Sequence, residues 1–150
     1  MSEHVLERRQ YVDRPIDEVF AFFSEARNLE RLTPSWLHFE TLTPAPIAME
    51  VGTRIEYRLR LHGMPVRWES LIEVWEPGEA FVDRQIRGPY LLWVHRHEFE
   101  SSGPGTLVRD TVRYAVPLGP LGEIARRLLV ARDLDRVFAF RQIAVARILG

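Results

Sequence analysis

Residues 120–150 read PLGEIARRLLVARDLDRVFAFRQIAVARILG, and this stretch decides the fold class. It has no proline after Pro120 and no glycine between Gly122 and Gly150, and it is rich in the helix formers Ala, Leu and Arg. The pattern predicts one long C-terminal helix. Because most of the chain before it reads as strands and turns, we expect this helix to pack against the concave face of a sheet.

The apolar residues of this helix follow two phases. The first stripe comprises Leu121, Ile124, Ala125 and Leu128, and the second comprises Leu134, Phe138, Val145 and Ile148. Leu128 and Phe138 are predicted to be buried. The change of phase fits either a core helix that bends near residues 132–136 or a helix that closes a cavity near its middle.

Composition narrows the class of protein. With 150 residues, 46% hydrophobic and 27% charged, the chain is expected to form one domain, residues 1–150, with a sizeable core. The net charge of −1 offers no basic excess for nucleic acid, and the lack of cysteine excludes disulfides and thiolate sites. No apolar run approaches membrane-spanning length, and no signal pattern begins the chain, so a cytoplasmic location is expected.

The rest of the chain predicts a series of hairpins. Proline and glycine turns separate segments in which apolar and polar residues alternate, which is typical of antiparallel strands. The expected strands are residues 4–12, 37–43, 53–62, 66–76, 80–87, 91–100 and 106–116. Two short helices are expected after the first strand, one opened by Pro15 and one at residues 29–32. The inward face of the first strand is left open.

This order predicts an α+β helix-grip fold, in which a curved seven-stranded antiparallel sheet wraps round the long C-terminal helix. The chain resembles a known protein family at a set of positions spread over most of its length. These positions are Pro15, Val19, Phe20, Phe22, residues 32–34, Gly52, and residues 81–85, 88–90, 93–97, 119–122 and 138–141. On these the chain resembles the START-like (SRPBCC) superfamily, in particular its polyketide cyclase/dehydrase-like ligand-binding branch.

The resemblance implies a cavity between sheet and helix. It implies binding of a hydrophobic small molecule, such as a lipid, quinone or polyketide, by a carrier or sensor. Two alternatives remain: an aromatase/cyclase or dehydratase, and a co-chaperone-type protein-interaction module. No dinucleotide, P-loop or nucleophile-elbow motif occurs, so no cofactor is expected. The ligand's identity and the oligomeric state are left open.

A polar group is expected on the inner face of the sheet. If Trp93 points inward, strand alternation also brings His95 and His97 inward. Hairpin loops at residues 88–90 and 102–105 would place Asp83 opposite His95 and Asp110 opposite His97. These four residues are the candidates for ligand orientation or for acid–base catalysis, and we favour ligand orientation.

The neighbouring carboxylates are expected to raise the pKa of at least one histidine. A metal site at His95 and His97 is less favoured than this network, because each imidazole has a carboxylate partner nearby.

Aromatic and apolar side chains would complete the binding site. The full expected set is Tyr57, Trp68, Phe81, Asp83, Gln85, Trp93, His95, His97, Phe99, Asp110, Tyr114, Leu128 and Phe138.

Overall fold

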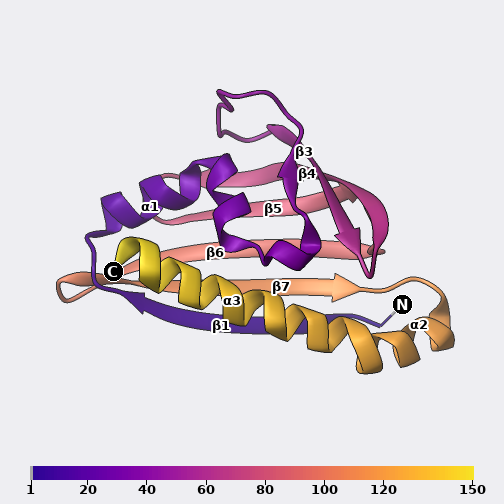
Figure 1. Ribbon diagram of the computed structural model, residues 1–150. Helices are drawn as coiled ribbons and strands as arrows, with labels where there is room; N and C mark the ends of the chain where they lie inside the picture. Colours follow the sequence, from indigo (N-terminus) through magenta and orange to yellow (C-terminus); the bar gives the residue numbers. More distant parts are fainter. Residues whose placement is uncertain (1) are drawn as a thin grey trace.

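The computed structural model describes residues 2–150 and contains one seven-stranded antiparallel sheet with its helices on the concave side (Figure 1). The strands are β1 (His4–Val12), β2 (Glu40–Thr41), β3 (Arg54–Leu61), β4 (Met64–Glu76), β5 (Ala80–Arg87), β6 (Leu92–Ser102) and β7 (Gly105–Ala115). Their order across the sheet is β1-β7-β6-β5-β4-β3-β2. The predicted helix-grip fold is confirmed.

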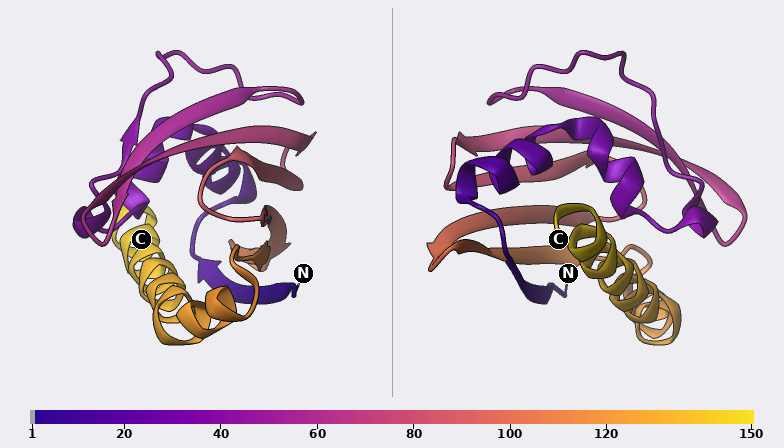
Figure 2. Two further views of the ribbon diagram at one scale, coloured as in Figure 1. Left: turned by 90° about the vertical axis from the view of Figure 1, so that its right-hand side faces the viewer. Right: turned by 60° about the vertical axis from the view of Figure 1, so that its left-hand side comes forward.

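The C-terminal helix runs without a break through α2 (Gly119–Ala125), a π-helical turn (Arg126–Val130) and α3 (Ala131–Leu149). Figure 2 shows α3 inside the curl of the sheet, with β1 on one side and the long β3–β4 hairpin on the other. A hydrogen bond from Gln10 to the Gln142 carbonyl (2.7 Å) joins β1 to α3, and one from Arg14, two residues after β1, reaches the Leu149 carbonyl (2.7 Å). The helix therefore closes one side of the curled sheet.

The expected burial of Leu128 is wrong, and that of Phe138 is confirmed. Leu121 is 72% exposed and Leu128 is 67% exposed, whereas Leu134, Phe138 and Val145 of the second stripe are buried. The π-helical turn at residues 126–130 lies between the two stripes. A π turn contains an extra residue, so it rotates the apolar face of the preceding segment away from the sheet. This irregularity also lies one turn before the bend expected at residues 132–136.

The segment between β1 and β3 departs most from the prediction. After α1 (Ile16–Ser24), the chain forms two 3₁₀ helices, Ala26–Leu32 and Ser35–Leu37, in place of one short helix. The strand expected at residues 37–43 is reduced to Glu40–Thr41. His38 has φ 47°, a left-handed conformation that breaks an extended strand at that point.

The hairpins fix the register of the central strands. His62 and Gly63, with φ of 50° and 82°, form the two-residue turn between β3 and β4, so β4 begins two residues earlier than expected. Asp83 lies opposite His95 and His97 lies opposite Asp110, as predicted. On β1 the half-buried or buried residues are His4, Leu6, Arg8, Gln10 and Val12. These side chains form the inward face of the first strand, which the sequence did not determine.

Candidate functional site

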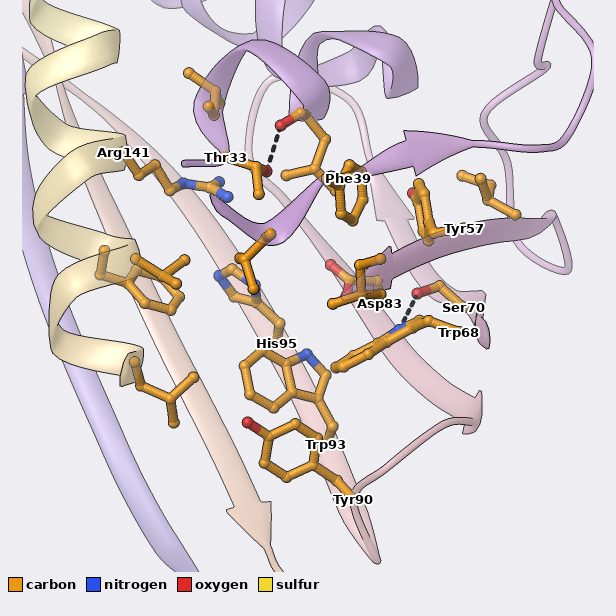
Figure 3. Close-up of a pocket in the computed structure, with 18 of the residues that line it drawn as sticks. Thr33, Phe39, Tyr57, Trp68, Ser70, Asp83, Tyr90, Trp93, His95 and Arg141 are labelled. Carbon is orange, nitrogen blue, oxygen red and sulfur yellow. Dashed lines mark hydrogen bonds between the residues drawn. The ribbon is translucent and has the colours of Figure 1, made fainter. Parts of the chain in front are cut away.

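A cavity of about 310 Å³ lies between the concave face of the sheet, the 3₁₀ helices and α3 (Figure 3). This is near the lower end of the usual range for small-molecule pockets. Its wall is mostly apolar, with Phe39, Ile55, Leu59, Trp68 and Trp93 among its residues. The cavity arises because a strongly curved sheet and a single helix leave space that their side chains do not fill. It can therefore bind an apolar ligand.

Polar side chains occupy one part of this wall. Asp83 comes from β5, His95 and His97 come from β6, and Arg141 comes from α3. Both histidines are only 5% exposed, and Arg141 is 8% exposed. In Figure 3, Arg141 reaches from the helix toward the sheet residues. Behind this wall, Asp110 of β7 is also buried. We call these five residues the polar wall.

The carboxylate–imidazole pairs of the polar wall run diagonally between the strands. His97 Nε2 lies 2.6 Å from Asp83 Oδ2, and His95 Nε2 lies 2.8 Å from Asp110 Oδ1. The directly opposite pairs, Asp83 with His95 and Asp110 with His97, were expected to make these bonds. An imidazole leans along its strand and reaches a diagonal neighbour, so the shortest contacts are diagonal. Of the two expected pairs, Asp110 with His97 is also in contact, with 3.5 Å between Asp110 Oδ1 and His97 Nδ1.

The aromatic rings of the polar wall form a stack. The centroids of His95 and His97 are 3.7 Å apart with 24° between their planes, and those of His97 and Phe81 are 4.0 Å apart with 15°. The edge of the stack meets Phe138 of α3, at 5.6 Å from His95. This packing leaves the imidazoles little freedom, so they present a rigid polar surface to the cavity.

The pKa of His97 is lowered to about 4, first by burial and then by the adjacent His95, although Asp83 and Asp110 act in the opposite direction. The expected rise in a histidine pKa is therefore wrong for His97. The hydrogen bonds agree with a neutral ring. Arg141 Nη2 lies 3.5 Å from His97 Nδ1, and a guanidinium can only donate, so Nδ1 accepts while Nε2 donates to Asp83.

The two carboxylates remain ionised. Burial by itself raises the pKa of Asp83, but the hydrogen bond from His97 and the nearby His95 and Arg141 outweigh it, so this pKa falls below its ordinary value. For Asp110 the same burial is outweighed by Arg141 and by the bond to His95, so its pKa is also lowered. The polar wall thus contains one buried carboxylate, Asp110, one half-buried carboxylate, Asp83, and one buried guanidinium.

One ligand atom from each of Asp83, His95 and His97 lies within 4.8 Å of the others, which is close enough to consider a metal site. However, the Nε2 atoms of the two histidines are engaged by two different carboxylates, Asp83 on β5 and Asp110 on β7. Arg141 would also repel a cation beside His97. The geometry favours a hydrogen-bonded network over a metal centre.

The structure brings together most of the residues expected to bind ligand. Those on the cavity wall are Tyr57, Trp68, Phe81, Asp83, Trp93, His95, His97 and Phe138. Asp110 lies one layer behind, against His95. Burial raises the pKa of Tyr57, with Asp83 and Glu30 adding to the effect, so its phenol stays protonated.

Four expected residues lie elsewhere. Gln85 makes two hydrogen bonds to the backbone of Tyr90 and so holds the β5–β6 loop closed. Phe99 packs against Phe20 in the core under α1, and Tyr114 packs against Tyr90, which lines the cavity in its place. Leu128 faces solvent, because the π-helical turn rotates its segment.

Arg141 is the member of the polar wall that the sequence analysis missed. It falls on the second stripe of the helix, three residues after Phe138 and four before Val145. An arginine in a buried helical phase was the available signal, but helix arginines usually extend to solvent.

At the rim of the cavity, His62 Nε2 lies 2.7 Å from Asp133 Oδ2. This contact joins the β3–β4 turn to the start of α3. It therefore bounds the opening between the hairpin and the helix.

The fold and the site together define a helix-grip protein with an internal, mainly apolar cavity and a buried polar wall. The family model described as "Polyketide cyclase / dehydrase and lipid transport" matches residues 12–140, and the chain belongs to this family. A comparison with curated proteins gives no match. In the part of the chain that the structure describes, no helix has the length and apolar character needed to cross a membrane.

Similar solved structures share the fold at low sequence identity. The Zhui aromatase/cyclase from Streptomyces sp. R1128 has a TM-score of 0.75 and 16% identity, covering 97% of this chain and 92% of its own. The protein TTHA0849 from Thermus thermophilus has a TM-score of 0.73 and 18% identity, covering 98% and 100%. Major latex-like protein 151 from Panax ginseng has a TM-score of 0.59 and 14% identity, covering 89% and 96%.

Proposed function

We propose that this protein binds a hydrophobic small molecule in the cavity between the sheet and α3, as a carrier or sensor. The observation that supports the proposal best is the cavity itself: about 310 Å³, mostly apolar, with one buried polar wall. Apolar surface provides affinity, and a few fixed polar groups set the orientation of the ligand. Lipids, quinones and polyketides are the ligand classes that match this combination.

Catalysis is the second candidate, since a cyclase or dehydratase would need a free acid–base group beside the ligand. Both nitrogens of His97 are already engaged, Nε2 by Asp83 and Nδ1 by Arg141. Its imidazole cannot take a proton from a ligand without breaking one of these contacts. This arrangement favours binding over acid–base turnover at His97. The interaction-module alternative does not account for a polar wall inside a cavity.

Native mass spectrometry of the purified protein provides the direct test, since a retained ligand would appear as a mass added to the chain. In parallel, an apolar fluorescent probe is expected to bind and to be displaced by polycyclic or long-chain compounds. Trp68 and Trp93 line the cavity, so their emission should change on binding.

Two matched variants would locate the binding site. Val137→Trp places a large ring in the cavity wall, whereas Ala139→Trp places the same ring on the exposed face of the same helix. Loss of probe binding only in Val137→Trp is the expected result. Equal binding in both variants, or no binding by the unaltered protein, would refute the proposal.

A further inference from the structure

Arg141 is a buried cation with incomplete hydrogen bonding. Among residues 2–150, its guanidinium makes one side-chain hydrogen bond, the long 3.5 Å contact to His97 Nδ1. Its other charged neighbour, Asp110 Oδ1, is 3.8 Å from Nη2, which is too far for a hydrogen bond. A guanidinium carries five N–H donors, and Arg141 lines the cavity, so its remaining donors depend on water or a ligand there for a partner.

The remaining neighbours of Arg141 cannot accept these hydrogen bonds conventionally. Its Cζ atom lies 5.4 Å from the ring centroid of Phe23 and 5.9 Å from that of Phe138. The side chain belongs to the cavity wall, and its N–H groups lie at the boundary between the polar wall and the apolar chamber. A bound ligand with an oxygen acceptor at this point would complete the hydrogen bonding of the guanidinium.

The charge of the polar wall decides what kind of acceptor fits. Asp83 and Asp110 already supply two negative charges against the single positive charge of Arg141. Protonating one imidazole would bring the net charge of the polar wall only to zero. An anionic ligand would therefore leave a net charge of −2 with both imidazoles neutral, or −1 with one protonated, in a site where charges interact strongly.

On the basis of the binding function proposed above, we infer that the ligand is uncharged and presents a carbonyl oxygen to Arg141, as a ketone, quinone or ester would. The apolar body of the ligand occupies the chamber lined by Phe39, Ile55, Leu59 and Trp68. Fatty acids and other carboxylates of the same size are discriminated against by Asp83 and Asp110. The polar wall therefore selects both for the oxygen acceptor and against negative charge.

Three naphthalene derivatives of similar shape provide the test: acetylnaphthalene, ethylnaphthalene and naphthoate. Equilibrium dialysis at neutral pH measures the affinity of each. The ketone is expected to bind about tenfold more tightly than the ethyl compound, which cannot accept a hydrogen bond from a charged donor. Naphthoate is expected to bind more weakly than the ketone.

Two variants test separately the hydrogen-bond donor, Arg141, and the net charge of the polar wall. Arg141→Met should abolish the preference for the ketone over the ethyl compound, while Arg147→Met, on the exposed end of the same helix, should retain it. Asp110→Asn removes one negative charge from the polar wall. It should therefore reduce the difference in affinity between the ketone and naphthoate. Because Asp110 also bonds His95, circular dichroism and the melting temperature would establish that this variant is folded.

The outcomes distinguish this inference from the proposed function. Equal binding of the ketone and the ethyl compound, or tightest binding of naphthoate, would overturn the inference and leave a binding cavity in place. Failure of all three compounds to bind or to raise the melting temperature would overturn both. If Arg141→Met fails to fold, the Asp110→Asn comparison still decides the charge argument.

Discussion

Acidification is expected to destabilise this protein through His97. The imidazole is neutral in the folded state, with a pKa of about 4, because it is buried and lies against His95. In the unfolded chain its pKa returns to about 6.5. Between these two values the unfolded chain binds a proton that the folded protein does not. Stability is therefore full above pH 6.5 and falls as the pH decreases toward 4.

The size of this effect follows from the two pKa values. Their difference of about 2.5 pH units corresponds to about 3 kcal/mol of unfolding free energy lost by pH 4. Below that pH, Asp83 and Asp110 extend the loss, because their lowered pKa values stabilise the fold only while both are ionised. The histidine and the carboxylates thus act in successive pH ranges.

Urea unfolding at several pH values between 7 and 4 would measure this loss, with His97→Gln as the test variant. The variant removes the titrating group, so its stability should change less over this range than that of the unaltered protein. His38→Asn is the matched control, since His38 is exposed and asparagine tolerates its left-handed backbone. Parallel pH profiles for the unaltered protein and His97→Gln would refute the reasoning.

Three further changes test the packing, the rim and the start of the helix. Phe138→Ala should cost about 3–5 kcal/mol in urea unfolding, whereas Leu128→Ala, on an exposed position, should cost about 0.5 kcal/mol or less. His62→Ala should speed ligand dissociation in stopped-flow by about two- to fivefold, since it removes one side-chain hydrogen bond worth about 1 kcal/mol or less; Arg58→Ala, which breaks an exposed pair outside the cavity, should not. Gly122→Ala should lower the free energy of unfolding in urea by about 1–3 kcal/mol, because its Cβ would collide with a carbonyl of the preceding loop; an unchanged free energy of unfolding would contradict this contact.

The strands and their register could be predicted from the sequence because both depend on local rules. Alternation along β6 places Trp93, His95, His97 and Phe99 on one face. The lengths of the two hairpin loops then set Asp83 and Asp110 against that face. Turn residues and a period of two are properties of neighbouring residues, so the helix-grip order and four members of the polar wall were accessible without a structure.

For the C-terminal helix, local sequence patterns predict that the helix forms but not which of its faces is buried. The existence of the helix follows from the helix propensity of residues 120–150. Its buried face does not, because a single π-helical turn at residues 126–130 rotates Leu128 into solvent. Such a turn depends on how the whole helix packs against the sheet.

The sequence alone determined the long strands, the C-terminal helix, the central register and four residues of the polar wall, since each follows from contacts close along the chain or across one hairpin. Only the tertiary structure decided the cavity, the diagonal pairing of His97 with Asp83, and the presence of Arg141. Arg141 is 44 residues from His97 along the chain, and their contact exists because α3 crosses the concave face of the sheet. The curvature of the sheet and the placement of the helix arise from many distant contacts at once, and no local pattern encodes them.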